Sequence, residues 1–286
     1  MVGTSTTGTS TTGTSTTDGA QLSFEGKRVL VTGASSGIGA ALAEAFALEG
    51  ATVGICARRE DRLKETYERC VAHGADCKMW VVDLSVPDQV DRLASAALDE
   101  LEGVDVLVNN AGIPKRRHVT QLDPATVESV MAINYFSPVR LTLALLPHML
   151  ERDDGLIVNV ASVAATLSSP GESAYDASKA ALAVFSEAMA IDLWDTGLSI
   201  AVVYPGLFDT ELFSLPDNDA PVTGIDPAPV SELVEAVMTG LKSGARQIYV
   251  PSWFADIAKG KVDNLEGFMS GAAAFVREQR EKREKS

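Results

Sequence analysis

Tyr175 and Lys179 lie four residues apart in a segment with helical character, and a third polar residue, Ser162, follows an apolar run upstream. One helical turn places the phenol and the ammonium on the same face of a helix. A phenol with a pKa of roughly 10 is a poor acid/base at neutral pH, and a nearby cation stabilises its phenolate. The pair therefore suits proton transfer. Because Tyr-x3-Lys also arises by chance, this interpretation needs support from elsewhere in the chain.

A glycine-rich turn near the other end of the sequence gives that support. Residues 29–31 read as a buried strand, residues 32–39 read Thr-Gly-Ala-Ser-Ser-Gly-Ile-Gly, and a helical segment follows. Glycines at such a turn let the backbone approach a pyrophosphate, and the amides of the helix N-terminus point at it. A P-loop would need Gly-Lys-Ser/Thr where this chain has Gly-Ala-Ala at 39–41. The turn thus predicts a dinucleotide site rather than nucleotide hydrolysis.

Together these motifs resemble those of the short-chain dehydrogenase/reductase family in its single-domain form. The resemblance covers residues 22–251 and adds Asn-Asn-Ala-Gly at 109–112, Asn134 within a helix, and Pro205-Gly206. The spacing of thirteen between Ser162 and Tyr175 is also the family's. The resemblance implies hydride transfer between a nicotinamide and a substrate carbonyl carbon, with Tyr175 exchanging the proton at oxygen.

The resemblance also implies a role for each site residue. Lys179 lowers the phenol's pKa and holds the nicotinamide ribose. Ser162 donates a hydrogen bond to the oxygen that becomes the alkoxide. Asn134 keeps a bend in its helix and anchors a water for proton relay. A purely structural polar role is the alternative for each. The expected cofactor contacts come from the glycine turn and the ends of later strands: Gly33, Ser35, Ser36, Gly37, Ile38, Gly39, Arg58, Arg59, Asp83, Leu84, Asn109, Ala111, Gly112, Tyr175, Lys179, Pro205, Gly206, Phe208 and Thr210.

The second expected strand bears on the choice of cofactor. A protein selecting NAD usually places an acid about 20 residues beyond the glycine turn, for the ribose 2′-hydroxyl. Here residues 56–59 read Cys-Ala-Arg-Arg, with no acid until Glu60. Guanidinium groups suit a 2′-phosphate. The sequence therefore favours NADP(H) over NAD(H), with Arg58 as the main contact and Arg59 as a weaker helper. The alternative is that both arginines only solvate the start of the next helix.

Two groups of expected cofactor contacts have alternatives that stay open. Asp83 resembles the family's adenine-contacting acid, but it can equally cap the helix that begins near Pro87. Asn109, Ala111 and Gly112 resemble the segment along the adenosine ribose. The asparagine side chains can instead stabilise the strand, and the two roles can coexist.

Seven short β-rich segments alternate with longer amphipathic stretches. They lie at residues 29–31, 52–56, 79–82, 104–108, 156–160, 200–204 and 248–250. This alternation predicts right-handed crossovers and a doubly wound parallel sheet with helices on both faces, a Rossmann-type α/β domain. Ligands of such sheets bind beyond the carboxyl ends of the strands, where each motif above falls.

Composition fits one catalytic domain, assigned to residues 21–270, with 46% hydrophobic residues to fill a core. A formal charge of −15 argues against nucleic acid or an anionic membrane surface as partner. Cys56, Cys70 and Cys77 form no Cys-x2-Cys pair, and the three histidines are scattered, so we expect no metal site and a reducing cytoplasm.

Both ends of the chain differ from this domain. Residues 1–20 carry Gly-Thr-Ser-Thr-Thr repeats that predict disorder and lack the features of a secretory signal. No run of eighteen apolar residues occurs, so no membrane span is expected. Residues 271–286 predict a charged, solvated helix, in which Glu278 with Lys282 and Glu281 with Lys285 are spaced as ion pairs.

The segment after Pro205-Gly206 predicts the substrate side. It supplies apolar residues and then a Pro/Asp/Gly-rich stretch to residue 226 that resembles the family's substrate lid and is expected to be mobile. Trp253 and Phe254 are candidates to close the same pocket. We therefore expect an apolar ketone or alcohol, lipid-, steroid- or aromatic-like, as substrate. Packing in the core or a subunit contact is the alternative for these residues: Leu207, Phe208, Leu212, Phe213, Leu215, Trp253 and Phe254.

Two functions are alternatives to an oxidoreductase, and the sequence also predicts a homo-oligomer. An NAD(P)-dependent epimerase or dehydratase would use the same cleft, usually with a further acid/base. A non-catalytic dinucleotide-sensing scaffold would need the glycine turn but not Ser162, Tyr175 and Lys179 together. The segments 134–149 and 177–193 are apolar over more than one helical stripe, which predicts a homodimer or homotetramer.

Overall fold

The computed structural model describes residues 21–284 except 214, 221 and 223, so the predicted disorder of residues 1–20 lies outside the described chain. Seven parallel strands form one sheet in the order β3-β2-β1-β4-β5-β6-β7. The predicted strands are all present, with ends that differ by one or two residues: β1 (Arg28–Thr32), β2 (Thr52–Ala57), β3 (Cys77–Val81), β4 (Val106–Asn109), β5 (Gly155–Val160), β6 (Leu198–Pro205) and β7 (Gln247–Val250). The doubly wound fold is confirmed.

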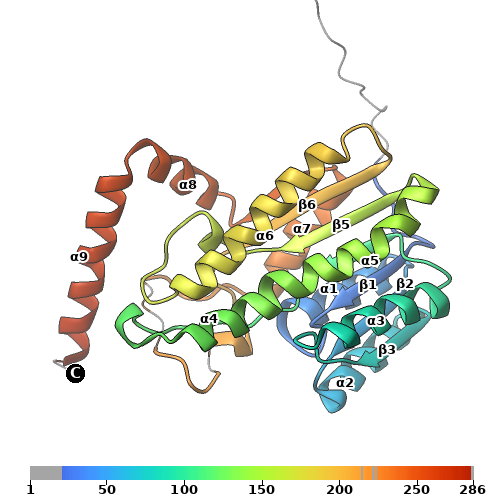
Figure 1. Ribbon diagram of the computed structural model, residues 1–286, viewed down its shortest axis with the longest axis horizontal. Helices are drawn as coiled ribbons and strands as arrows, with labels where there is room; N and C mark the ends of the chain where they lie inside the picture. The colour runs from blue at the N-terminus through green and yellow to red at the C-terminus, as the bar shows by residue number, and fades with distance from the viewer. Residues whose placement is uncertain (1–20, 214, 221, 223, 285–286) are drawn as a thin grey trace, which may run out of the picture.

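Helices cover both faces of this sheet (Figure 1). One face carries α1 (Gly37–Leu48), α2 (Glu60–Ala72) and α7 (Val230–Lys242), and the other carries α3 (Pro87–Glu100), α5 (Ser137–Arg152) and α6 (Ser173–Asp192). The strands are buried on both sides because helices cover both faces of the sheet. Successive residues of a strand point to opposite faces and therefore belong to different cores. In β1, Val29 and Val31 belong to the first core, while Leu30 belongs to the second.

A long helical segment runs across the second face. It comprises α4 (Pro124–Met131), a π-helical turn (Ala132–Phe136) and α5. The whole of Pro124–Arg152 is long and apolar enough to cross a membrane by length and composition, which the sequence analysis does not anticipate. In this fold α4 lies against α6, while α5 packs on the sheet and contributes Leu141, Leu145 and Met149 to the core.

Two helices follow the last strand, α8 (Phe254–Asp263) and α9 (Leu265–Glu284). In Figure 1, α9 stands away from the sheet, beyond α8. It begins at Leu265, so the predicted tail boundary at residue 271 falls inside a continuous helix. The predicted pair of Glu278 and Lys282 forms at 2.7 Å, whereas Lys285, the partner predicted for Glu281, lies outside the described residues.

The strand order reverses between β1 and β4, which lie side by side although β2 and β3 separate them in sequence. The connections leave these two strands toward opposite sides of the sheet, so a crevice opens beyond their carboxyl ends. The glycine turn follows β1, and the Asn-Asn-Ala-Gly segment follows β4. The fold thus places both motifs at the switch point.

Candidate active site

The glycine turn after β1 is sterically closed to larger residues. Gly33 has φ +69°, and a Cβ there would lie 2.7 Å from the Cα of Ala111. A Cβ on Gly39 would collide with the carbonyl oxygen of Gly33. The Oγ1 of Thr32 accepts hydrogen bonds from the backbone N–H groups of Asn110 and Ala111, at 3.0 and 3.1 Å. These contacts hold the turn against the end of β4 and leave its backbone free to face a phosphate.

The two arginines after β2 differ in their contacts. Arg59 donates to the Ser36 hydroxyl at 2.8 Å and to the Ser35 hydroxyl at 3.3 Å, and it pairs with Glu211 at 2.8 Å. Arg58 is exposed, and its charge adds a small contribution to the lowered pKa of the Asp83 carboxyl, after the hydrogen bonds from Ser85. Both line the same cavity. The Arg59 guanidinium is therefore already bound to other side chains. The Arg58 guanidinium lines the cavity and makes no hydrogen bond to the described residues.

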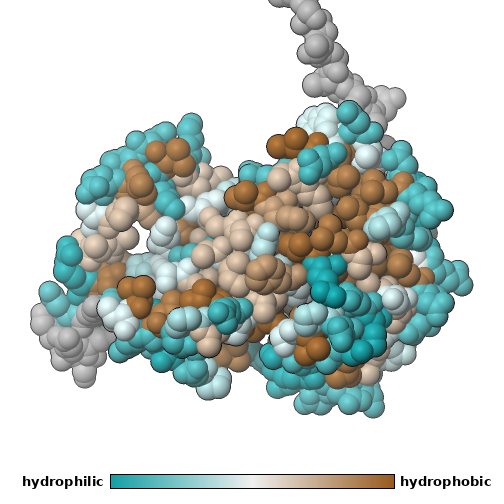
Figure 2. All heavy atoms as spheres, in the orientation of Figure 1, coloured by the Kyte–Doolittle hydropathy of each residue, from teal (hydrophilic) through white to brown (hydrophobic). Residues whose placement is uncertain are grey.

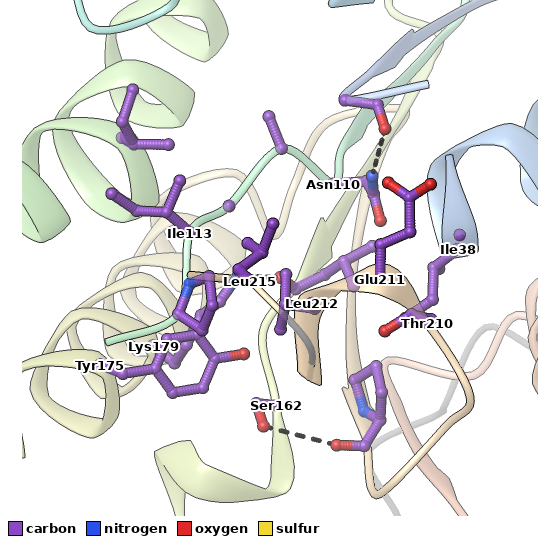
Figure 3. A pocket seen from close by; sticks show the side chains of 18 of the residues that line it. Ile38, Asn110, Ile113, Ser162, Tyr175, Lys179, Thr210, Glu211, Leu212 and Leu215 are labelled. Atoms are coloured by element: carbon purple, nitrogen blue, oxygen red, sulfur yellow. Dashed lines mark hydrogen bonds between the residues drawn. The ribbon is translucent and has the colours of Figure 1, made fainter. Parts of the chain in front are cut away.

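The structure brings three of the four predicted catalytic residues, Ser162, Tyr175 and Lys179, into the lining of one cavity. Ser162 follows β5, and its hydroxyl accepts from the Ala164 N–H at 3.1 Å. Lys179 is 3% exposed and its Nζ donates to the Val160 carbonyl at 2.8 Å. Figure 3 shows Tyr175, Lys179 and Ser162 in one corner of the cavity. The first turn of α6 and the end of β5 thus face each other across the site.

Asn134 is fully buried inside the π-helical turn. Its Oδ1 accepts from the Ile113 N–H at 2.8 Å, and its Nδ2 donates to the Ile113 carbonyl at 3.0 Å and to the Ser178 hydroxyl at 2.9 Å. The side chain therefore ties the irregular turn to the segment after β4 and to α6. This agrees with the predicted bend in the helix.

The electrostatics of the tyrosine differ from the sequence expectation. Burial raises the pKa of the Tyr175 phenol, the Glu172 carboxylate raises it further, and the Ser162 hydroxyl opposes both. Burial lowers the pKa of Lys179 to about 8. The Lys179 ammonium lies 5.9 Å from the centroid of the tyrosine ring, engaged with a backbone carbonyl. The expected lowering of the phenol's pKa is therefore wrong for the protein alone, and the phenol holds its proton at neutral pH.

Four predicted cofactor contacts are not among the residues that line the cavity: Gly39, Asp83, Asn109 and Phe208. Asn109 is 3% exposed, and its Nδ2 donates to Thr142 and Asn159, which is the strand-stabilising alternative. Phe208 is 2% exposed and packs in the core with α1 and α7, because its bridge to Ala228 turns the side chain away from the cavity. Phe208 does not line the cavity, and a cofactor contact of this residue stays a prediction.

Asp83 does not cap the following helix. Its Oδ1 accepts from the N–H and the hydroxyl of Ser85, at 2.9 and 2.7 Å, so it closes a local turn. Val86 holds the cap position of α3 and makes no side-chain cap. The capping alternative is wrong, and any adenine contact of Asp83 stays a prediction. The remaining predicted cofactor residues that line the cavity are Gly33, Ser35, Ser36, Gly37, Ile38, Arg58, Arg59, Leu84, Ala111, Gly112, Tyr175, Lys179, Pro205, Gly206 and Thr210.

On the substrate side, charged side chains join two segments that are far apart in the sequence, and these contacts were not predicted. Lys115 pairs with Asp217 at 2.6 Å, and Arg117 donates to the same carboxylate at 2.6 Å. Arg116 donates from its backbone to Asn218 and from its Nε to the Asp219 carbonyl. We call residues 115–117 with 217–219 the lid clamp. Its signal in the sequence is a Lys-Arg-Arg run and an Asp-Asn-Asp run of opposite charge, about a hundred residues apart.

The cavity has a volume of about 410 Å³ and contains both the glycine turn and the catalytic corner. Figure 3 shows Leu212 and Leu215 between these two parts. Phe254 instead packs under Gly206, and Trp253 stacks on Phe254 with 3.9 Å between ring centroids. Neither aromatic is among the residues lining the cavity. On the substrate side, the charged side chains of Arg116 and Glu172 also line the cavity, whereas the sequence predicts an apolar lining there.

Comparisons with known proteins agree with this geometry. The family model described as short chain dehydrogenase matches residues 27–219. A short chain dehydrogenase of Pseudocercospora fijiensis is 38% identical over 78% of this chain and 71% of its own length. The 11-beta-hydroxysteroid dehydrogenase 1A of Arabidopsis thaliana is 36% identical over 80% of this chain and 69% of its own.

Solved structures show the same fold. A short-chain dehydrogenase from Sphingobium yanoikuyae in complex with NADPH is 29% identical, has a TM-score of 0.75, and matches over 85% of this chain and 95% of its own. Other similar structures carry NAD or NADP. With its matched family model, its sheet order and its Ser-Tyr-Lys corner, the chain belongs to the short chain dehydrogenase family of oxidoreductases.

Proposed function

We propose that the protein is an NADP(H)-dependent oxidoreductase that interconverts a carbonyl and a secondary alcohol. The observation that carries this proposal is that Ser162, Tyr175 and Lys179 line the same cavity as the glycine turn. A scaffold that only sensed a dinucleotide would have no need for an acid/base corner beside it. When bound, the nicotinamide cofactor supplies or accepts the hydride.

The residues of the chain manage the proton and the oxygen. Because burial keeps the Tyr175 phenol protonated, this side chain is poised to donate a proton to the carbonyl oxygen during reduction. Ser162 supports the same oxygen with its hydroxyl, and its 9% exposure means that little water competes for that contact. Lys179 places a buried positive charge beneath the ring, where it favours the phenolate left after proton donation.

The preference for NADP(H) rests on the end of β2. No carboxylate follows Ala57 before Glu60, and the exposed Arg58 lies on the cavity wall. A 2′-phosphate would find a guanidinium there without displacing another hydrogen-bonded partner. Arg59 serves the phosphate less directly because it is bound to Ser36 and Glu211.

An apolar body is proposed for the substrate because most of the substrate end of the cavity is hydrocarbon. The side chains concerned are Ile113, Val163, Leu207, Leu212, Leu215 and Val222. The relative named as a hydroxysteroid dehydrogenase is consistent with a substrate of this kind.

Assembly into a homodimer or homotetramer is proposed from the exposed faces of α5 and α6. Figure 2 shows hydrophobic side chains gathered over these two helices. Leu143, Val184 and Ile191 are 54%, 64% and 72% exposed. An apolar surface of this kind marks an interface, which pairs with its own copy in a symmetric oligomer. Sedimentation at micromolar concentration tests this, and a monomer would contradict it.

The activity is tested with purified protein, NADPH and a panel of apolar ketones and aldehydes, followed at the nicotinamide absorbance. We expect NADPH oxidation that depends on both protein and carbonyl. An epimerase or dehydratase would convert its substrate without net NADPH consumption, and a sensing scaffold would bind NADPH without turnover. Either result would replace the proposed function.

A further inference from the structure

Glu172 is a cavity-lining carboxylate with no hydrogen bond among the described residues. It lies at the residue before α6, and only 20% of its side chain is exposed. Arg116 is its one ion-pair partner in the described chain, and the Nη1 to Oε1 distance is 3.9 Å. That distance is too long for a direct hydrogen bond. A largely desolvated carboxylate without a hydrogen bond is costly unless a ligand or water satisfies it.

The guanidinium opposite Glu172 is held in place by the lid. The Nε of Arg116 donates to the Asp219 carbonyl at 2.9 Å, and its backbone N–H donates to the Asn218 side chain at 2.8 Å. Arg116 is 4% exposed. The two charged groups therefore form a fixed polar pair in a cavity whose other walls at this end are mainly apolar.

From this pair we infer that the substrate carries a hydroxyl group besides its reacting carbonyl, and that the hydroxyl binds between Arg116 and Glu172. Two atoms 3.9 Å apart leave room for an oxygen about 2.8 Å from each. A hydroxyl accepts a hydrogen bond from the guanidinium and donates one to the carboxylate. An anion or a second carbonyl would only accept hydrogen bonds and would leave the Glu172 carboxylate unsatisfied, and an ammonium would be repelled by the Arg116 guanidinium.

The position of the pair also limits where this hydroxyl lies. Glu172 and Tyr175 are three residues apart at the start of α6, a spacing at which Cβ atoms are roughly 5–6 Å apart. The hydroxyl and the reacting carbonyl therefore lie a few carbon atoms apart on one molecule. The substrate class is an apolar hydroxyketone, or the matching diol in the oxidative direction. This inference rests on the proposed carbonyl–alcohol chemistry.

Glu172 also has an alternative role that the test must separate. The same carboxylate raises the pKa of Tyr175, and Arg116 lowers it. A residue that acted only through the tyrosine would change the turnover of every substrate by the same factor. A residue that binds a substrate hydroxyl changes the ratio between substrates with and without that group.

The test compares kcat/KM for matched pairs of apolar ketones, each with and without a hydroxyl two to four carbons from the carbonyl, using NADPH. We expect the wild type to prefer at least one hydroxylated member by about tenfold or more, the size of a hydrogen bond to a charged group. Glu172→Leu should bring that ratio near one, and Glu172→Gln should leave an intermediate ratio. Glu128→Leu, at an exposed position of α4, should keep the wild-type ratio.

Dissociation constants for NADPH establish that each variant has kept its fold. Equal rates for both members of every pair in the wild type would overturn the inference while the proposed function stood. A Glu172→Leu variant that slowed both members equally would show a role through Tyr175 and would also overturn it. If the wild type reduced no ketone at all, the proposed function would fail and this inference with it.

Discussion

The two halves of the cavity are built in different ways. On the cofactor side, the turn after β1 and the segment after β4 are locked by backbone contacts, and a Cβ at Gly33 would meet Ala111 at 2.7 Å. On the substrate side, the lid is held by side-chain ion pairs, such as Lys115 with Asp217. The first half is fixed by sterics, and the second by charges that water and salt can weaken.

The substrate side of the cavity is the half that can move. Asp217 has a side chain that is 75% exposed, and pairs at such positions contribute roughly 0 to 1 kcal/mol each. The glycine turn has no comparable freedom because its neighbours are strands of the central sheet. We therefore expect substitutions in the two halves to have separable effects, with cofactor affinity changed by one and substrate kinetics by the other.

The largest expected effect comes from the acid/base group. Tyr175→Phe removes the proton donor while keeping the ring, so turnover should fall by about 10²-fold or more. NADPH affinity should stay close to the wild-type value because the glycine turn is untouched. Steady-state kinetics and NADPH titration test this, with Tyr67→Phe on α2 as the control. More than about a tenth of wild-type turnover in Tyr175→Phe would refute the assignment.

A smaller effect is expected at the cofactor phosphate. Arg58→Ala should weaken NADPH binding roughly 10- to 150-fold, the cost of a lost charge-assisted contact, and should leave NADH binding nearly unchanged. Arg59→Ala should cost less, because Arg59 must leave Glu211 to bind a phosphate. Dissociation constants for both cofactors on each variant measure this. Equal losses for NADPH and NADH would make Arg58 an ordinary surface residue.

The buried lysine predicts the pH dependence. Its pKa is about 8, below the usual value for lysine, so the ammonium is present below that pH and is lost as pH rises through it. The pKa of Tyr175 is raised, so the phenol stays protonated over the same range. We expect kcat/KM for reduction to fall above about pH 8, by up to about tenfold per pH unit. A profile flat to pH 9.5 would argue against a charged Lys179 in the reaction.

The smallest effect is expected at the lid clamp. Asp217 has φ +61°, which asparagine also tolerates, so Asp217→Asn removes the charge and keeps the backbone. KM for a ketone should rise about two- to fivefold, since each exposed pair contributes little, while NADPH affinity should not change. Added salt should raise KM in the wild type more than in the variant. Asp226→Asn, at an exposed position further along the lid, should behave as the wild type.

Features carried by the backbone or by short spacing were predictable from the sequence. The seven strands follow from apolar periodicity, and the Ser162–Tyr175–Lys179 set follows from its order and spacing. The two asparagines of the Asn-Asn-Ala-Gly motif show a limit of this prediction. Asn109 is the predicted cofactor contact, but Asn110 is the one that lines the cavity. The direction of a strand's last side chain depends on the sheet, which the motif does not specify.

Contacts between distant segments were not predictable from one sequence. The lid clamp joins residues about a hundred positions apart, and either charged run alone reads as a solvated surface. Glu172 was missed because its position opposite Arg116 follows from contacts between distant segments, among them the hydrogen bond from Arg116 to Asp219. The raised pKa of Tyr175 also depends on the folded surroundings, because desolvation and the Glu172 carboxylate outweigh the Ser162 hydroxyl and Arg116.

The proposed reaction is the transfer of a hydride from a nicotinamide to a carbonyl carbon within this cavity. The most direct measurement uses NADPH labelled with deuterium at the transferable C4 position, a ketone that the wild type accepts, and mass spectrometry of the product. We expect an alcohol with one deuterium on the carbinol carbon, formed in equal amount to the NADP⁺ produced. Unlabelled alcohol, or a rearranged or dehydrated product without NADP⁺ formation, would contradict it.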